Sequence, residues 1–239
     1  MIPVLSVPDL VPATFRFRPN RFLCHADIAT SNGIMRNQTV HVHDPGRLKE
    51  LLYPGNQLLV RYAANPNRKT RWDLIAVNFN TDWVLINSSF HSRIARTILE
   101  NPATSPIPGI ADIQCEKMIG TSRIDFLLTL TNGHRMALEV KGCTLAEEGI
   151  ALFPDAPTIR GTRHVNELMK WLRTDRESSI VFLVFRKDAT SFRAHSQTDP
   201  KFAGMLNQAI HAGVNVFALR FQWDDGTLFF DREIPVIFK

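Results

Sequence analysis

Short runs of apolar residues alternate with polar ones through residues 14–85 of the chain. Alternation with a period of two is typical of strands, and turn signals such as Asn32-Gly33 and Pro54-Gly55 separate the runs. The predicted strands cover residues 15–17, 21–30, 34–43, 57–63, 72–78 and 83–86. One short helix is expected at residues 46–52. About five strands with one small helix indicate a small closed barrel, for which an OB fold fits best and an SH3-like barrel is the alternative.

The pattern changes near residue 87, where helical spacing and longer apolar runs replace the alternation. A proline-rich loop is expected at residues 101–110. The predicted helices cover residues 88–100, 158–174 and 200–212, and the predicted strands cover residues 112–118, 122–130, 134–140, 180–185 and 214–221. This order predicts a mixed α/β sheet with right-handed crossovers, whose central strand is the apolar run 180–185. We therefore expect two domains, residues 1–86 and 87–239.

Net charge adds a candidate partner to this division. The chain carries 28 Lys and Arg against 23 Asp and Glu, and residues 1–85 hold ten of the cations and six of the acids. The positive excess therefore lies in the first third, as in a module that neutralises phosphates. Many soluble proteins are mildly basic, so the charge favours nucleic-acid binding without establishing it.

Other residue patterns bear on location. No apolar run reaches the ~20 residues of a membrane helix. The N-terminal segment contains three prolines and lacks the features of a signal or transit peptide. Cys24, Cys115 and Cys143 are widely spaced and form no CxxC pair, so reduced thiols and a cytoplasmic protein without membrane contact are expected. His41 and His43 would share one face of a strand, which is weak evidence for a metal site.

Asp125, Glu139 and Lys141 are the candidates for chemistry. The turn predicted at residues 131–133 should form a hairpin that brings Asp125 close to Glu139. Glu139 and Lys141 are two residues apart and project to one face of their strand. Two carboxylates beside an ammonium can hold Mg²⁺ or Mn²⁺ for phosphodiester hydrolysis, with Lys141 orienting water or stabilising charge. The flanking residues are apolar, so these charges are costly unless they are paired or bound to metal; a structural ion pair is the alternative.

The helix predicted after this hairpin begins with a group of charged residues. Arg160, His164 and Glu167 fall on one face, offset from the apolar stripe. Arg160 and Arg163, near the helix N-terminus, are candidates to receive phosphate, although an ordinary solvated helix face would show the same pattern. Gly161 lowers helix stability by roughly 1 kcal/mol and therefore indicates a close approach to its backbone.

Several stretches of the chain resemble the sugar fermentation stimulation protein A family. They are HVHDPGRLKELL (residues 41–52), RKT (68–70), SRIDF (122–126), EVK (139–141), LFPDAPTIRG (152–161) and DPKFA (199–203). The resemblance covers residues 14–220, and the stretch at 152–161 is far more specific than Glu139-Val140-Lys141 alone. Gly142 departs from the Ser or Asn of many relatives, at a position that supplies no ligand.

The resemblance implies an N-terminal OB-like β-barrel that binds nucleic acid, followed by a PD-(D/E)xK restriction-endonuclease-like α/β domain. It also implies DNA binding with a role in the regulation of sugar metabolism. The nuclease-type acids fall on Asp125 and Glu139, the lysine falls on Lys141, and Glu116 matches a further family acid that would be a catalytic residue or third ligand. Mg²⁺ or Mn²⁺ is the expected cofactor, held by Asp125, Glu139 and Val140.

Three functions are compatible with these patterns. The first is a magnesium-dependent nuclease that binds and cuts DNA, and the second is a non-catalytic DNA-binding regulatory protein on a nuclease scaffold. The third is a metal-dependent enzyme acting on a small phosphorylated substrate. Trp72 is either a stacking platform for a base or part of the barrel core. The residues expected to contact nucleic acid are Arg47, Arg68, Lys69, Arg71, Arg123, Arg160, Arg163 and His164. DNA, single-stranded or duplex, is the expected partner, and a homodimer is a candidate assembly.

Overall fold

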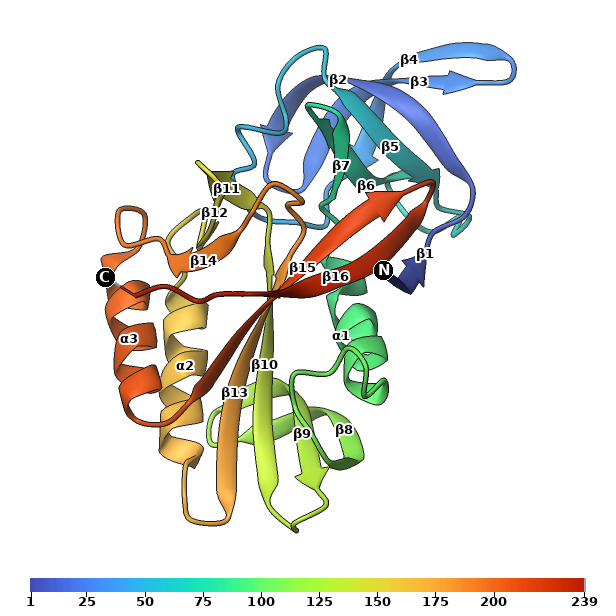
Figure 1. The fold of residues 1–239 in the computed structure, drawn as a ribbon. Helices are drawn as coiled ribbons and strands as arrows, with labels where there is room; N and C mark the ends of the chain where they lie inside the picture. Colours follow the sequence, from blue (N-terminus) through green and yellow to red (C-terminus); the bar gives the residue numbers. More distant parts are fainter. Residues whose placement is uncertain (239) are drawn as a thin grey trace. The chain divides into compact units, whose positions relative to one another are not determined.

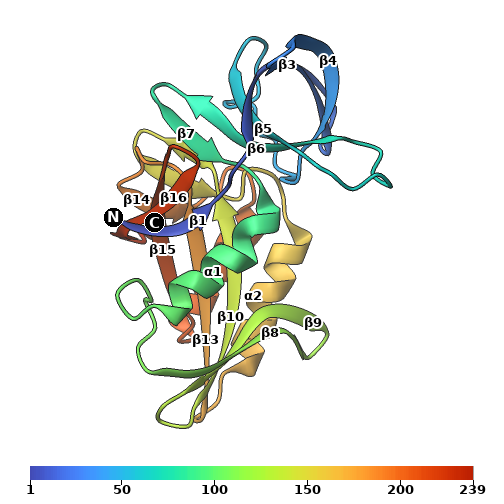
Figure 2. The same cartoon turned by 90° about the vertical axis from the view of Figure 1, so that its right-hand side faces the viewer.

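The first unit of the chain is a closed barrel. The computed structural model describes residues 1–238 and divides into two units, one formed by Pro3–Phe90 with Gln222–Phe229 and the other mainly by His91–Phe221 and the residues from Phe230 onward. The barrel strands are β2 (Leu10–Asn20), β3 (Leu23–Thr30), β4 (Gly33–His41), β5 (Gln57–Tyr62), β6 (Trp72–Phe79) and β7 (Asp82–Leu85). They follow the order β4-β3-β2-β5-β6-β7, and pairing of Val40 with Trp72 closes β4 onto β6 (Figures 1 and 2). The predicted small barrel is confirmed.

Alternating burial explains why these segments form a barrel. Ala13 and Phe15 of β2 and Leu58 and Val60 of β5 point into the interior, while the residues between them are more exposed. Leu74 and its neighbours in β6 are buried without interruption. The first unit also contains most of β1 (Ile2–Ser6) and the start of β16 (Thr227–Ile234). The apolar positions therefore gather into one core inside the barrel.

The prediction of a helix at residues 46–52 is wrong. This segment forms turns, and Leu48 takes a φ of 51°, which an α-helix does not allow. Its leucines recur at helical spacing, but the barrel core buries them instead: Leu48 and Leu51 are both fully enclosed. Arg18 fixes the loop by donating hydrogen bonds from Nη1 to the carbonyl oxygens of Gly46 and Arg47, both at 2.9 Å. Tertiary packing therefore overrides the local pattern.

The second unit is a mixed sheet covered by helices. Its strands are β8 (Ile110–Ile119), β9 (Ser122–Leu130), β10 (Arg135–Cys143), β13 (Arg176–Val184), β15 (Asn215–Asp224) and β16, and they follow the order β16-β15-β13-β10-β9-β8. Strands β10, β13 and β15 are parallel, whereas β9 runs antiparallel to β10 and to β8. Strand β13 is central and buried on both faces, as predicted. The second unit also contains a small separate sheet of β11 (Leu145–Glu147), β12 (Ile150–Phe153) and β14 (Ser191–Ala194). These three strands were not predicted from the sequence.

Helices cover both faces of the larger sheet. Helices α2 (Ile159–Trp171) and α3 (Pro200–His211) pack on one face, where Val165, Leu168 and Phe202 share a core with Ala137 and Phe182. Helix α1 (His91–Glu100), preceded by the 3-10 turn Ser88–Phe90, lies on the other face (Figures 1 and 2). Within residues 1–238, no helix combines the length and apolar character needed to cross a membrane.

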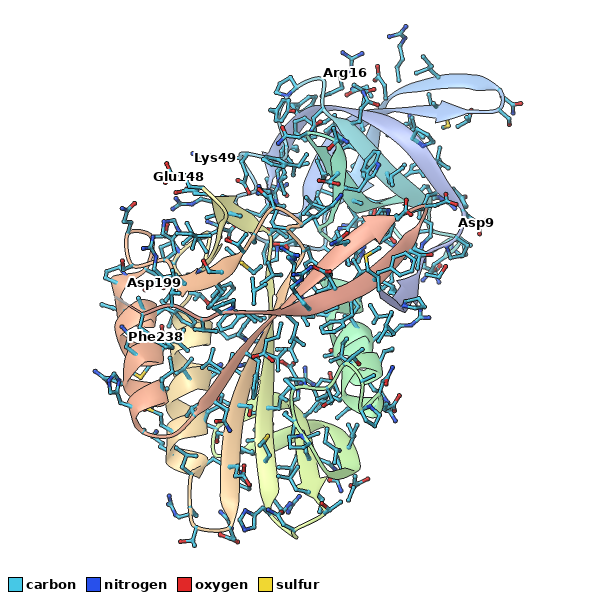
Figure 3. The ribbon with its side chains drawn as sticks, viewed as in Figure 1. Asp9, Arg16, Lys49, Glu148, Asp199 and Phe238 are labelled. Carbon is cyan, nitrogen blue, oxygen red and sulfur yellow. The ribbon has the colours of Figure 1, made fainter. Side chains whose placement is uncertain are left out.

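One carboxylate holds the starts of both α2 and α3. Asp199, labelled in Figure 3, precedes α3 and caps it. Its Oδ1 accepts the N–H of Phe202 at 2.9 Å, and its Oδ2 accepts the N–H of Thr158 at 2.7 Å. Thr158 in turn caps α2 by accepting the N–H of Gly161 at 3.0 Å. A Cβ on Gly161 would lie 2.8 Å from Thr158 Cγ2 and 3.3 Å from Phe202 Cε2. The close approach predicted at Gly161 is therefore real, and it is made by protein side chains.

Candidate metal centre

The β9–β10 hairpin places Asp125 and Glu139 side by side. The paired positions run from Arg135 and Thr129 to Leu138 and Phe126, so the next two residues along the strands, Glu139 and Asp125, face each other. Opposed residues of antiparallel strands share a face, as the turn spacing predicted. Asp125 Oδ2 also accepts the N–H of Val140 at 2.7 Å. The hairpin therefore fixes one acid against the backbone beside the other.

Glu139 is the buried centre of the group. Its side chain is 3% exposed, and Oε1 receives both the Lys141 ammonium and Nδ1 of His164. Its other oxygen, Oε2, is buried and has no hydrogen-bond partner among the residues that the structure describes. An unsatisfied buried carboxylate oxygen is costly in a folded protein and calls for an explanation such as a bound ion.

The two acids have pKa values displaced in opposite directions. Burial, followed by the nearby charge of Glu139, raises the pKa of Asp125. Burial also opposes ionisation of Glu139, but the hydrogen bond from His164 and the charge of Lys141 outweigh it and lower the pKa of Glu139. Divergent pKa values in a carboxylate pair are typical of sites that bind cations or exchange protons.

Helix α2 contributes residues to this centre. Arg160 donates from Nε to His164 Nε2 at 3.4 Å, and His164 and Glu167 are 2% and 7% exposed. Arg160 and His164 lie on one face of the helix, as predicted. The alternative that this face is solvated is wrong for His164 and Glu167, because both side chains are buried. Glu167 Oε2 would lie only 2.2 Å from a Cβ on Gly120, at the β8–β9 turn. Because His164 is enclosed against Glu139, the structure does not place it on a nucleic-acid surface.

Glu116 lies outside the buried group. The pairs Cys115–Phe126 and Lys117–Ile124 place it opposite Asp125 on β8, but its φ is 53° and its side chain is 67% exposed. Glu116 Oε2 lies 3.6 Å from Nη1 of Arg123, itself 60% exposed. The resemblance implied a catalytic or ligand role for Glu116, and the structure places its side chain at the exposed surface of β8.

Of the barrel residues expected to contact nucleic acid, some are exposed and others are held within the barrel. Arg47, Lys69 and Arg71 are exposed. Arg68 instead donates from Nη1 to Asp73 Oδ2 at 2.9 Å and from Nη2 to Oδ1, and it is therefore committed to an internal ion pair. Trp72 is only 8% exposed and belongs to the core, which excludes it as an open platform for a base. Its neighbour Tyr62, which is 51% exposed, contacts the Trp72 ring edge-on.

Histidine 43 belongs to the same ion pair. Its Nε2 lies 3.1 Å from Asp73 Oδ1, and the ring of His41 contacts it edge-on at 4.3 Å. No group of three or more His, Cys, Asp or Glu residues suited to a metal occurs within residues 1–238. The contacts of His41 and His43 given by the structure are therefore their own ring contact and the pairing of His43 with Asp73.

We expect the stability conferred by Asp73 to be lost in acid. Burial raises its pKa, but the hydrogen bonds from His43 and Arg68 outweigh burial and bring the pKa below its usual value. An unfolded Asp titrates at about 3.9, so the contribution is complete above that pH and is lost as pH falls through the lower folded value. Urea denaturation of wild type and Asp73→Asn should therefore show a gap at pH 7 that narrows at pH 3. A gap of constant size would contradict this, and Asp224→Asn, at an exposed acid, is the control.

Asp125 and Glu139 fit a hard divalent cation. Two carboxylates converge from adjacent strands, and the buried Glu139 Oε2 lacks a partner. The Val140 carbonyl belongs to the residue between Glu139 and Lys141 and can supply a third oxygen. Oxygen donors of this kind suit Mg²⁺, Mn²⁺ and Ca²⁺, which retain water in their remaining positions. The residues present therefore match the expected ion, although they provide fewer protein ligands than a closed structural site.

The comparisons with known proteins agree with this architecture. The SfsA N-terminal OB domain matches residues 17–86, and the sugar fermentation stimulation protein RE domain matches residues 89–227. The sugar fermentation stimulation protein homolog of Methanococcoides burtonii is 45% identical over 235 residues, covering 98% of this chain and 94% of that protein. The homolog of Methanothermobacter thermautotrophicus is 44% identical over 216 residues, covering 90% and 88%.

A solved structure extends the similarity to the whole fold. The structure of Pyrococcus furiosus SfsA in complex with Ca²⁺ has a TM-score of 0.90 and 28% identity, and the match covers 100% of each chain. The expected mixed α/β architecture is confirmed as an OB-like barrel followed by a restriction-endonuclease-like domain. This chain belongs to the sugar fermentation stimulation protein family.

Proposed function

We propose that the protein is a metal-dependent nuclease acting on DNA. The observation that carries the proposal is the buried, unpartnered Glu139 Oε2 beside Asp125 and Lys141. This arrangement of two acids and one lysine corresponds to the PD-(D/E)xK pattern. The relative from Pyrococcus furiosus, described in complex with Ca²⁺, supports the presence of a divalent cation in this fold. We further propose that Mg²⁺ or Mn²⁺ is the working ion.

Each residue of the centre has a distinct proposed role. Asp125, Glu139 and the Val140 carbonyl would hold the cation, which when bound polarises the scissile phosphate and lowers the pKa of coordinated water. Lys141 supplies a positive charge to orient the attacking water and to balance charge on the phosphate. His164 orients Glu139 through its hydrogen bond, as outer partners of metal ligands commonly do. Glu116 is a further acid that would need to turn inward to act.

The proposed partner, DNA, is supported by the distribution of cations. Exposed Arg47, Lys69 and Arg71 of the barrel provide phosphate contacts, and residues 1–86 are the proposed binding domain. Arg160 and Arg163 provide further contacts in the proposed nuclease domain, residues 87–239. Such contacts make affinity salt-dependent because phosphate neutralisation releases counterions. The cytoplasm is the proposed location, consistent with three cysteines that are all free thiols.

A second candidate function is DNA binding without turnover, in a regulator of sugar metabolism. It is favoured by the exposed position of Glu116, which leaves two carboxylates rather than three at the centre. A regulator would need the basic surfaces but no active metal. The two functions therefore differ in whether Asp125 and Lys141 are needed for DNA cleavage.

A cleavage assay separates these functions. Wild type, Asp125→Ala and Lys141→Ala are incubated with single-stranded, duplex and branched DNA in Mg²⁺, Mn²⁺ or EDTA. The nuclease proposal predicts cuts by wild type in metal, no cuts in EDTA, and loss of cutting in both variants. Binding of DNA by all three proteins without cutting by any would reject the nuclease and leave the regulator. Circular dichroism of each variant confirms that it is folded.

A further inference from the structure

The first turn of α2 presents an exposed apolar side chain, and two exposed arginines follow it in the sequence. Ile159, the first residue of this helix, is 91% exposed, more than any other large hydrophobic side chain within residues 1–238. Arg160 and Arg163 are also exposed. The turn contains no acidic residue, although acids are favoured and cations disfavoured at a helix N-terminus. The sequence therefore accepts two unfavourable features at one place.

This turn adjoins the candidate metal centre. Arg160 Nε lies 3.4 Å from His164 Nε2, and His164 binds Glu139, whose Oε2 is buried and unpartnered. The turn is also held firmly, because Thr158 donates its N–H to Asp199 and accepts that of Gly161. Ile159 is therefore presented by a fixed piece of backbone, five residues before His164 and next to Arg160, which contacts His164.

We propose that Ile159 is a wedge that enters between adjacent base pairs of duplex DNA bound at this centre, while Arg160 and Arg163 contact the phosphates around it. The inference rests on the proposed DNA-binding function. Apolar side chains, isoleucine among them, insert between base steps and kink the duplex. A β-branched side chain has few rotamers and loses little freedom on insertion. Burial of the exposed isoleucine surface and the arginine–phosphate contacts together offset the unstacking.

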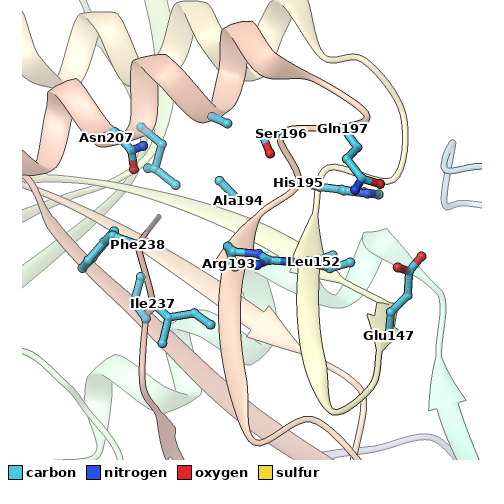
Figure 4. A pocket seen from close by; sticks show the side chains of 13 residues that line it. Glu147, Leu152, Arg193, Ala194, His195, Ser196, Gln197, Asn207, Ile237 and Phe238 are labelled. Atoms are coloured by element: carbon cyan, nitrogen blue, oxygen red, sulfur yellow. The ribbon is translucent and has the colours of Figure 1, made fainter.

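A cavity elsewhere in the second unit gives less support for a binding site than the exposed Ile159 does. The cavity between β12, β14, α3 and the C-terminal segment has a volume of about 190 Å³, and its wall includes Arg193, His195, Gln197 and Asn207 (Figure 4). Apolar side chains such as Leu206 and Phe238 line the rest of it. His195 as a residue is partly buried, and its Nδ1 is enclosed without a hydrogen-bond partner, but this single nitrogen does not specify which ligand the cavity would hold. The proposed wedge is supported by two observations, which are the exposed side chain of Ile159 and the candidate metal centre beside its helical turn.

The test uses 2-aminopurine, whose fluorescence rises when it loses stacking. Short duplexes carry the probe at successive positions and are titrated with the full chain in EDTA, so that no cutting occurs. Wild type should raise the fluorescence at one or more positions, and Ile159→Ser should reduce that rise at least about threefold while weakening affinity less than about threefold. Ile159→Leu should restore most of the rise. Ile34→Ser, at a 62% exposed isoleucine on β4, is the matched control and should behave like wild type.

Several outcomes would overturn the wedge. Equal fluorescence with wild type and Ile159→Ser would do so, as would an equal loss caused by Ile34→Ser. A change in sedimentation with Ile159→Ser, without a change in fluorescence, would assign Ile159 to self-association instead. Cleavage of the same duplexes in Mn²⁺ is scored separately: fluorescence that depends on Ile159 without any cleavage would uphold the wedge and reject the nuclease. Absence of DNA binding by wild type would reject both.

Discussion

Lys141→Ala is expected to bind Mn²⁺ at least as tightly as wild type and yet to cut DNA at least about a hundredfold more slowly. The ammonium of Lys141 contacts Glu139 Oε1, so its removal takes a positive charge away from the acids and does not weaken a ligand. What the variant loses is the charge proposed to orient water and stabilise the phosphate. The roles of binding and turnover should therefore separate at this residue.

Glu139→Gln should show the opposite behaviour. Glutamine preserves the size of the buried side chain but removes the negative charge, and Mn²⁺ affinity should fall at least about a hundredfold, with cutting lost as a consequence. Isothermal titration with Mn²⁺ and single-turnover cleavage measure the two quantities. Glu147→Gln, at an exposed acid of the same unit, is the control. Equal Mn²⁺ affinity in wild type and Glu139→Gln would contradict the assignment of Glu139 as a ligand.

Gly142→Ala is expected to lower the free energy of unfolding by about 3 kcal/mol through overpacking. The φ of Gly142 is not positive, so the obstacle is steric: a Cβ would lie 2.1 Å from His91 Cε1 and 2.6 Å from Nε2. His91 cannot turn away freely, because its ring stacks on Phe185 with centroids 5.4 Å apart and its Nε2 is enclosed. Burial, followed by the charge of Lys141, lowers the pKa of His91 to about 4, so the ring is neutral at pH 7.

A double-mutant cycle tests this contact. Urea denaturation of wild type, Gly142→Ala, His91→Ala and the double variant gives the coupling between the two positions. The double variant should be more stable than the sum of single losses predicts, by about 1–2 kcal/mol, because the new methyl group occupies space left by the ring. Simple additivity would show that the cost of Gly142→Ala arises elsewhere.

The sequence predicted those parts of the fold that depend on local spacing. The turn at residues 131–133 sets the register of β9 and β10, and this register alone brings Asp125 opposite Glu139. Burial alternates in β5 and in part of β2, which made strands of this kind recognisable from the sequence. By contrast, β11 and β12 have only three and four residues, too short for a periodic pattern to show.

What could not be predicted depends on contacts between distant residues. The meeting of His164 and Glu139, 25 positions apart, depends on how α2 packs on the sheet. Arg68 and Asp73 are only five positions apart, but their pairing depends on how the chain bends between them, which the residue pattern does not indicate. Glu116 lies opposite Asp125 in the strand register, but nothing in the sequence indicates its φ of 53° or the exposure of its side chain. Residue type and spacing identify candidates, whereas packing decides which of them meet.

The double attachment at Asp199 has a consequence for motion near the candidate centre. Its two carboxylate oxygens secure Phe202 at the start of α3 and Thr158 at the start of α2, so neither helix end can fray without disturbing the other. Local opening of the turn that carries Ile159 and Arg160 is thereby linked to opening of α3. We expect the two helix ends to open together, so that the residues proposed to meet DNA are protected from local opening by both helices.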